Sequence, residues 1–234
     1  MSNRRPSSAR WLEEHRNDPY VAAARRDGYR SRAAYKLLEI DSALAARSGG
    51  RGLFRPGDVV LELGAAPGGW TQVAARRVGD AGRVVAMDLL PMDPVPGVLI
   101  LQGDFLDEAI LEPLRLGLGP TGRADVVLSD MAPNMTGVKI ADQGRGSLLV
   151  EAALGFASEV LRPGGRIVLK MFQGPDFHDL VRAARIHFTQ VKVEKPPASR
   201  DRSAELYLIG SGFRAAPMAF QEETLQDRGI PCAS

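Results

Sequence analysis

The chain of 234 residues is long enough for one sizeable α/β domain with a large core. It has 44% hydrophobic and 25% charged residues, as in an ordinary globular protein, and it contains no apolar run that could cross a bilayer. The basic start, MSNRRPSSAR, lacks the apolar stretch of a secretory signal. Composition therefore favours a cytoplasmic protein with no membrane partner.

Cysteine and histidine content argues against a metal site. The single cysteine, Cys232, excludes an internal disulfide and a cysteine-based metal cluster. The three histidines, His15, His178 and His187, are scattered, and none has a ligand spacing such as HExxH. We expect no metal in this protein.

Positive charge is concentrated at the N-terminus. Residues 1–36 hold nine basic and four acidic residues, whereas the rest of the chain holds 21 basic and 24 acidic residues. Such a segment is either a solvated tail or an arm for an anionic polymer, and charge alone does not separate the two. We predict a basic arm over residues 1–30, the main domain over 31–212, and a disordered tail over 213–234.

The stretch SRAAYKLLEIDSAL is typical of an amphipathic helix. Apolar residues recur at spacings of four, seven and eleven from Ala33 to Leu44, and Ser31 is available as the N-cap. Arg32 and Lys36, four residues apart, share a different face of this helix, close to the basic arm.

From residue 58 onward, short apolar runs alternate with helical patterns. The helical patterns cover residues 70–79, 105–117, 146–165 and 176–188. This alternation predicts a doubly wound, mostly parallel α/β sheet of the Rossmann-like type. Near the end, QVKVEK and ELYLIG follow each other without a helix, which predicts an antiparallel edge. The five earlier strand candidates are DVVLEL, GRVVAMDLL, GVLILQGD, ADVVLSD and GRIVLKMF.

The stretch LELGAAPGGW, residues 61–70, places three glycines, two alanines and a proline after the first predicted strand. Ligands of doubly wound sheets bind beyond the carboxyl ends of the strands, and small residues let the backbone approach a ligand there. The next helix would add unpaired N–H groups and the positive end of its dipole. Neither GxGxxG nor GK[ST] is present, which disfavours a dinucleotide or a nucleoside triphosphate. A tight turn without a ligand remains the alternative.

Three aspartates end three successive predicted strands. Asp88 ends the second strand, Asp104 the third and Asp130 the fourth. An isolated aspartate at such a position is usually a helix cap or a turn former, but three of them beside a Gly-rich turn indicate a binding rim. Asp88 is placed to accept both hydroxyls of an adenosine ribose.

Lys170 lies inside the fifth predicted strand, among apolar neighbours. A lysine in such a strand is costly unless it is paired, although one near a strand end can also reach solvent. Periodicity alone does not distinguish Lys36 or Glu205 from other charged residues.

Taken together, these motifs resemble the FtsJ/RrmJ-like family of ribosomal RNA large subunit 2′-O-ribose methyltransferases. The resemblance runs from about residue 8 to residue 210. The motifs that carry it are RWLEEH, RSRAAYKLLEI, LGAAPGGW, DLLPMDP, LQGDF, SDMAPNMTG, PGG with VLKMFQG, and VKVEKPPASRDRS with ELY.

The resemblance implies a Lys-Asp-Lys-Glu catalytic set, S-adenosylmethionine as cofactor, and a uridine ribose in the A-loop of large-subunit (23S-type) ribosomal RNA as substrate. Its partner would be ribosomal RNA or the large ribosomal subunit, and we expect a monomer. In this chain the catalytic set corresponds to Lys36, Asp130, Lys170 and Glu205. The cofactor site corresponds to Gly68, Trp70, Asp88, Asp104 and Asp130.

A ribose 2′-hydroxyl is a poor nucleophile until its proton is withdrawn, so the protein must supply orientation and a base. We expect Lys170 to accept the proton, Asp130 and Glu205 to orient the two lysines, and Lys36 to steer the ribose or a phosphate. Two alternatives stay open: 2′-O-methylation of another RNA, such as transfer RNA or an mRNA cap, and a non-catalytic RNA-binding module in ribosome assembly. Methylation of an exocyclic amine is disfavoured because DMAP lacks an aromatic residue to stack on a flipped base.

Overall fold

A computed structural model describes residues 18–133, 136–137, 139–200 and 203–215. Residues 1–17 of the predicted arm and residues 216–234 of the predicted tail lie outside the described residues. Within the described part of the chain, every helix is too short or too polar to span a membrane.

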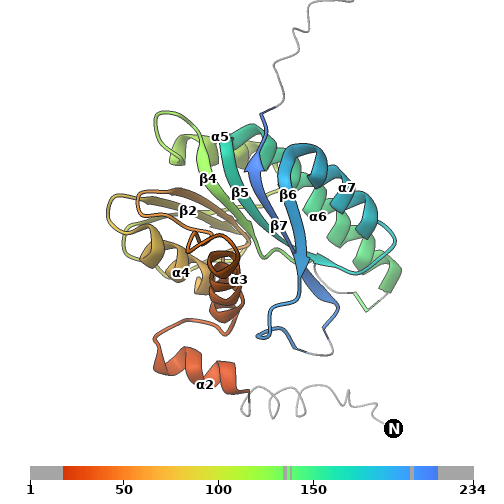
Figure 1. Ribbon diagram of the computed structural model, residues 1–234, viewed down its shortest axis with the longest axis horizontal. Coiled ribbons are helices and arrows are strands. Elements are labelled where there is room, and N and C mark those ends of the chain that lie inside the picture. Colours follow the sequence, from red (N-terminus) through yellow and green to blue (C-terminus); the bar gives the residue numbers. More distant parts are fainter. Residues whose placement is uncertain (1–17, 134–135, 138, 201–202, 216–234) are drawn as a thin grey trace, which may run out of the picture.

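Seven strands form one sheet in the order β3-β2-β1-β4-β5-β7-β6 (Figure 1). Neighbouring strands from β3 to β5 are parallel, whereas β7 lies between β5 and β6 and is antiparallel to both. The predicted doubly wound sheet with an antiparallel edge is confirmed. The strands are β1 (Val59–Leu63), β2 (Arg83–Asp88), β3 (Val98–Gln102), β4 (Ala124–Ser129), β5 (Leu161–Phe172), β6 (Phe188–Glu194) and β7 (Glu205–Phe213).

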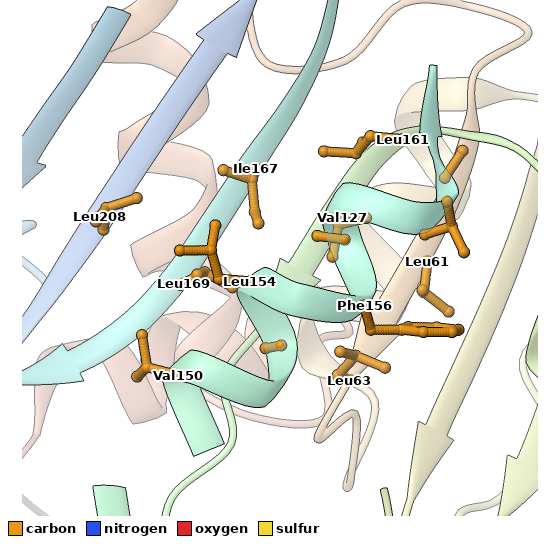
Figure 2. Packing of buried hydrophobic residues seen from close by; sticks show 14 of the residues in the cluster. Leu61, Leu63, Val127, Val150, Leu154, Phe156, Leu161, Ile167, Leu169 and Leu208 are labelled. Carbon is orange, nitrogen blue, oxygen red and sulfur yellow. The ribbon is translucent and has the colours of Figure 1, made fainter. Parts of the chain in front are cut away.

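Helices cover both faces of this sheet. Leu37 of α3 and Trp70 of α4 belong to a buried cluster on one face. On the other face, α5, α6 and α7 cover a second cluster that includes Leu154 of α6 (Figure 2). The helices are α2 (Pro19–Arg26), α3 (Ala33–Arg47), α4 (Gly69–Val78), α5 (Glu108–Gly117), α6 (Lys139–Val160) and α7 (Phe177–His187).

Strand β4 shows why the parallel strands appear as continuous apolar runs. All six of its residues are buried. Val126 and Leu128 belong to the cluster under α3 and α4, whereas Val127 belongs to the cluster on the opposite face. Because successive side chains alternate between two covered faces, a central parallel strand needs apolar residues at nearly every position.

The predicted helix over residues 146–165 is too long at its C-terminal end. Helix α6 ends at Val160, and Leu161 already begins β5. Gly164 has a φ of 80°, which is incompatible with a right-handed helix, and Pro163 lacks the N–H that a helix interior requires. The register between β4 and β5 shifts at this point, between Ala124 and Val126.

The predicted N-cap at Ser31 is wrong. Helix α3 begins at Ala33, and the preceding residue, Arg32, has helical backbone angles and makes no capping bond. The Ser31 hydroxyl faces the start of α4 instead, where a Cβ on Gly69 would lie 2.3 Å from its Oγ. Packing against α4 therefore takes precedence over capping.

Residues 18–30 of the predicted arm lie against the domain. Asp18 caps α2 by accepting from the N–H of Tyr20 at 3.0 Å. The Arg30 side chain donates to the carbonyl oxygens of Asp93 and Pro94, both at 2.7 Å. These contacts bring the segment before α3 beside the loop that follows β2.

Candidate active site

The Gly-rich turn joins β1 to α4 at the carboxyl edge of the sheet. Gly64 and Gly68 have φ values of 76° and 104°, in the left-handed region that favours glycine. A Cβ on Gly64 would lie 2.6 Å from Cγ of Met131, and one on Gly68 would lie 2.9 Å from Nη1 of Arg30. Backbone conformation and close segments of the same chain therefore require small residues here, in addition to any ligand.

The start of α4 has no side-chain cap. Gly68 is its N-cap and makes no side-chain capping bond. Because glycine has no side chain to accept from the N–H groups of the first turn, no capping side chain offsets the positive end of the helix dipole, which favours an anionic or polar group nearby.

The three predicted rim aspartates lie at the carboxyl ends of neighbouring parallel strands. Asp88 is the last residue of β2, and Asp130 directly follows β4. Strand β3 ends at Gln102, so Asp104 lies two residues beyond the strand rather than on its last position. Since β2 and β4 flank β1, and β3 lies beside β2 with all four strands parallel, all three aspartates share the edge that carries the Gly-rich turn.

Asp88 connects this turn to the loop after β2. Its Oδ2 accepts from the N–H of Ala66, and its Oδ1 accepts from the N–H of Leu90, both at 2.8 Å. A carboxylate has about four acceptor positions, so both oxygens keep capacity for a ligand hydroxyl. Asp104 is exposed, and its Oδ1 accepts from the N–H of Leu106 at 3.0 Å.

The Trp70 side chain does not line this rim. It is 2% exposed, and its indole N–H donates to the carbonyl of Ala33 at 2.8 Å. Its ring packs at 5.6 Å from the ring of Tyr207. Any contact between Trp70 and a cofactor would therefore come from its backbone, while its side chain anchors α3 to α4.

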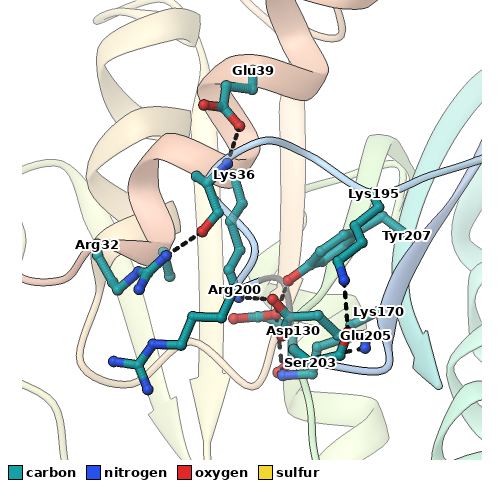
Figure 3. A network of polar contacts seen from close by, with 12 residues as sticks. Arg32, Lys36, Glu39, Asp130, Lys170, Lys195, Arg200, Ser203, Glu205 and Tyr207 are labelled. Carbon is teal, nitrogen blue, oxygen red and sulfur yellow. Dashed lines mark hydrogen bonds and ion pairs between the residues drawn. The ribbon is translucent and has the colours of Figure 1, made fainter. Parts of the chain in front are cut away.

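Two lysine–carboxylate pairs lie beside this rim (Figure 3). Lys36 Nζ lies 2.6 Å from Oε1 of Glu205, and Lys170 Nζ lies 3.2 Å from Oδ1 of Asp130. All four side chains are largely buried, with exposed fractions between 10% and 20%. Lys170 also donates to the backbone carbonyl of Asp130. The structure thus brings together the four residues predicted to be catalytic, from α3, β5, β7 and the end of β4.

Tyr207 connects the two pairs. It faces Lys170 across the β5–β7 ladder, and its hydroxyl donates to Oδ1 of Asp130 at 3.0 Å. Lys36 Nζ lies 5.7 Å from the centre of its ring, within cation–π range. Burial, reinforced by the charge of Asp130, raises the pKa of the phenol, so Tyr207 remains a hydrogen-bond donor.

Burial and the two nearby lysines act in opposite directions on the pKa of Glu205. Burial alone would raise the pKa of this carboxyl, but the ammonium group of Lys36 and, more weakly, that of Lys170 outweigh the burial. Its pKa therefore lies below the usual value. Glu205 remains an anion at neutral pH and holds Lys36 in position.

A fifth acidic group, Glu62 of β1, lies behind the Gly-rich turn. It is fully buried, and its Oε2 accepts from the hydroxyl of Thr71 at 2.6 Å. Its other oxygen, Oε1, has no protein partner among the described residues. Burial raises its pKa to about 8, and the charges of Asp130 and Asp88 add to that effect. Glu62 is therefore mostly protonated at neutral pH.

Sequence reasoning missed Tyr207 and Glu62. Tyr207 lies two residues after Glu205 on the same strand, a spacing that places both side chains on one face. Glu62 is the one charged residue in the buried run VVLEL, and a carboxyl there is costly unless it is protonated or paired. Both signals are in the sequence, but neither by itself indicates a site.

A cleft of about 450 Å³ opens beside the two lysine–carboxylate pairs. It is lined by Arg32, Lys36, Arg200, Ser203 and Glu205. Arg32 pairs with Asp18, and Arg200 lies 3.7 Å from the same carboxylate. The cleft therefore has cationic walls next to Lys36. Among the described residues, no three His, Cys, Asp or Glu side chains are grouped to hold a metal ion.

The sheet order and the site at its carboxyl edge define a Rossmann-like methyltransferase. A solved Plasmodium falciparum structure, described as a ribosomal RNA methyltransferase, matches with a TM-score of 0.66 and 28% identity over 79% of this chain and 98% of that one. Residues 29–213 match the model of the FtsJ-like methyltransferase family, and the chain belongs to that family.

Two bacterial relatives agree with this assignment. Ribosomal RNA large subunit methyltransferase E of Magnetococcus marinus is 59% identical over 92% of this chain and 100% of its own length. The protein of the same name from Chromobacterium violaceum is 53% identical over 90% of this chain and 99% of its own length. The resemblance inferred from the motifs is confirmed: the protein is a methyltransferase, and S-adenosylmethionine is its methyl donor.

Proposed function

We propose that this enzyme methylates a ribose 2′-hydroxyl of large-subunit ribosomal RNA, at a uridine in the A-loop. The observation that carries the proposal is the pair of buried lysines, Lys36 and Lys170, each held by a carboxylate beside the Gly-rich turn. The names of the relatives from Magnetococcus marinus and Chromobacterium violaceum support ribosomal RNA as the substrate.

The rim fits the methyl donor. The uncapped start of α4 suits a polar group of the cofactor, and the spare acceptor positions of Asp88 suit the ribose hydroxyls. Leu89 and Leu106 are 56% and 60% exposed beside Asp88 and Asp104, and such side chains suit the faces of an adenine ring. The bound cofactor would supply a methyl group already activated by its sulfonium charge.

Within this site, Lys170 accepts the proton of the 2′-hydroxyl and so makes its oxygen the nucleophile toward the methyl group that the bound cofactor would supply. Asp130 holds Lys170 in place and is itself fixed by the hydroxyl of Tyr207. Lys36, held by Glu205, faces the cationic cleft and steers the ribose or an adjacent phosphate. Lys170 must be neutral to act as the acceptor, a role that its amine can fill and a guanidinium cannot.

The test is methyl transfer from labelled S-adenosylmethionine to large-subunit ribosomal RNA, transfer RNA and capped mRNA offered separately, followed by mapping of the 2′-O-methyl groups. Labelling confined to one uridine of the A-loop would support the proposal. Preferred labelling of transfer RNA or of the cap would identify that RNA as the substrate instead. Binding of RNA without methyl transfer to any of the three would favour a non-catalytic assembly factor.

A further inference from the structure

A second cleft lies at the opposite end of the elements that build the active site. It has a volume of about 940 Å³ and is bounded by the end of α3, the loop 48–55, the start of β5, strand β6 and the end of β7. Lys170 faces Tyr207 at one end of the β5–β7 ladder, whereas Arg166 faces Ser211 at the cleft end. Lys36 is likewise in the first turn of α3, and Arg47 is its last residue.

Cations dominate this cleft. Seven arginine or lysine side chains line it, and its lining contains no aspartate or glutamate. Six of these residues are exposed, and only Arg166 is buried. The exposed six are Arg47, Arg51, Arg55, Arg185, Lys192 and Arg214.

Three of the seven cations have partners within the fold. Arg166 pairs with Asp58 at 2.9 Å, and Arg47 pairs with Glu194. Arg214 donates to the carbonyls of Arg185 and Phe188, at the end of α7. These three contacts stabilise the walls of the cleft and do not call for a ligand.

The other four cations have no carboxylate partner among the described residues: Arg51, Arg55, Arg185 and Lys192. Arg51 and Arg55 belong to the loop after α3, whereas Lys192 comes from β6, so unpaired charge lies on separate walls of an open cleft. An extended polyanion can neutralise such an arrangement, because its charges recur along its length.

We propose that this basic cleft binds the phosphate backbone of the RNA substrate at a segment separate from the methylated nucleotide. The proposal rests on the function proposed above for the identity of that RNA. Lys170 lies four residue positions after Arg166 on β5, which corresponds to roughly 13 Å at the rise of a β-strand. Arg47 lies eleven residue positions after Lys36 on α3, which corresponds to about 17 Å at the rise of an α-helix. A folded RNA that enters the active site is large enough to reach the cleft as well.

The test compares two double variants with the same loss of charge. Arg51→Gln/Lys192→Gln removes two unpaired cations from the cleft. The matched control, Arg83→Gln/Arg182→Gln, removes two exposed cations that do not line the cleft, one at the start of β2 and one on α7. Affinity for protein-free large-subunit ribosomal RNA and for isolated unmethylated large subunits is measured for each protein across a salt series.

The cleft variant should bind both RNA probes roughly tenfold more weakly near 0.1 M salt, and its slope of log affinity against log salt should fall by about 1–2 relative to the control. Affinity for S-adenosylmethionine and the rate at saturating RNA should match the wild type. The charge-preserving variant Arg51→Lys/Lys192→Arg should retain the wild-type slope, which separates lost charge from damaged structure.

Equal slopes for the cleft and control variants would overturn the proposal, as would a loss of affinity in the charge-preserving variant. Weakened binding to large subunits but not to protein-free RNA would assign the cleft to a ribosomal protein instead. If the wild type transferred no methyl group to RNA and the slopes still differed, the proposed function would fail and the RNA-binding cleft would stand. If the wild type transferred methyl groups to RNA and the cleft and control variants had equal salt slopes, only the proposal about the basic cleft would be wrong.

Discussion

The two ends of the assembly built on α3, β5 and β7 differ in how completely their cations are paired, because at the cleft end only Arg47 and Arg166 have a carboxylate partner among the described residues. At the active-site end, Lys36 and Lys170 each have a carboxylate partner, and all four side chains are largely buried. At the cleft end, Arg51 and Lys192 are exposed and have no carboxylate partner in the described part of the chain.

This difference reflects what each end must do. A lysine that acts on a single atom must be held in one place, and a buried carboxylate and a tyrosine hydroxyl supply that constraint. A cation that meets a flexible polyanion gains from remaining solvated and unpaired until the anion arrives. Complete pairing therefore distinguishes the proposed reaction site from the surface proposed for RNA, where four of the seven cations have no carboxylate partner among the described residues.

Glu62 is the exception at the active-site end. It has no ionic partner among the described residues, and burial raises the pKa of its carboxyl to about 8. A charge that cannot be paired is here removed by protonation.

The largest effect is expected at Lys170. Lys170→Ala should lower the rate of methyl transfer by ~10²–10⁴-fold, the usual contribution of a general base. Lys170→Arg should be nearly as damaging because a guanidinium stays protonated, whereas Lys36→Arg should be milder because its partner Glu205 requires only positive charge. Single-turnover rates of methyl transfer are measured for the three variants and the wild type, with cofactor affinity measured in parallel. If Lys170→Arg transferred the methyl group at near the wild-type rate, Lys170 would supply only positive charge and would not be the proton acceptor.

A pH-dependent effect on stability is expected at Glu62. Between its ordinary pKa of 4.5 and its folded pKa of about 8, the native state holds a proton that the unfolded state releases. The free energy of unfolding should therefore fall by on the order of 2–5 kcal/mol as pH rises through this window. Above the window it should level off. Glu62→Gln should remove this dependence. Denaturant unfolding of the wild type and of Glu62→Gln from pH 5 to pH 9 gives the free energy of unfolding at each pH. If the two proteins showed the same dependence on pH, Glu62 would be ionised in the folded protein.

A smaller effect is expected at the cofactor rim. Asp88→Ala should weaken binding of S-adenosylmethionine by on the order of 1–3 kcal/mol, because the ribose hydroxyls lose their acceptor. Asp88→Asn keeps one acceptor oxygen and should lose less. Calorimetry provides the affinities, and melting temperatures control for the lost bonds to Ala66 and Leu90. Unchanged affinity in both variants would remove Asp88 from the cofactor site.

The smallest effect is expected from the N-terminus. Deleting residues 1–17 removes four arginines and two glutamates but keeps Asp18 and α2. If this part of the predicted arm contacts phosphates, RNA affinity should fall a fewfold and its salt slope should decrease by about 1–2, with cofactor affinity intact. A wild-type salt slope in the truncated protein would make the segment a solvated tail.

The sequence by itself determined the sheet and the chemistry of its carboxyl edge. Apolar runs of strand length between helical patterns specified a doubly wound fold, because strands covered on both faces need apolar residues throughout. The Gly-rich turn and the aspartates after successive strands followed from that pattern. Lys36 and Glu205 came only from the family resemblance, since single charged residues have no period.

Only the tertiary structure decided which charges are paired. Glu205 and Lys36 are 169 positions apart in the numbering, and only the packing of α3 against the β5–β7 ladder brings them to 2.6 Å. The same packing directs the Trp70 indole inward and directs Ser31 toward α4. It leaves Arg51 and Lys192 without a carboxylate partner among the described residues. Ion pairing depends on distances of a few ångströms between segments remote in sequence, and local patterns carry no information about such distances.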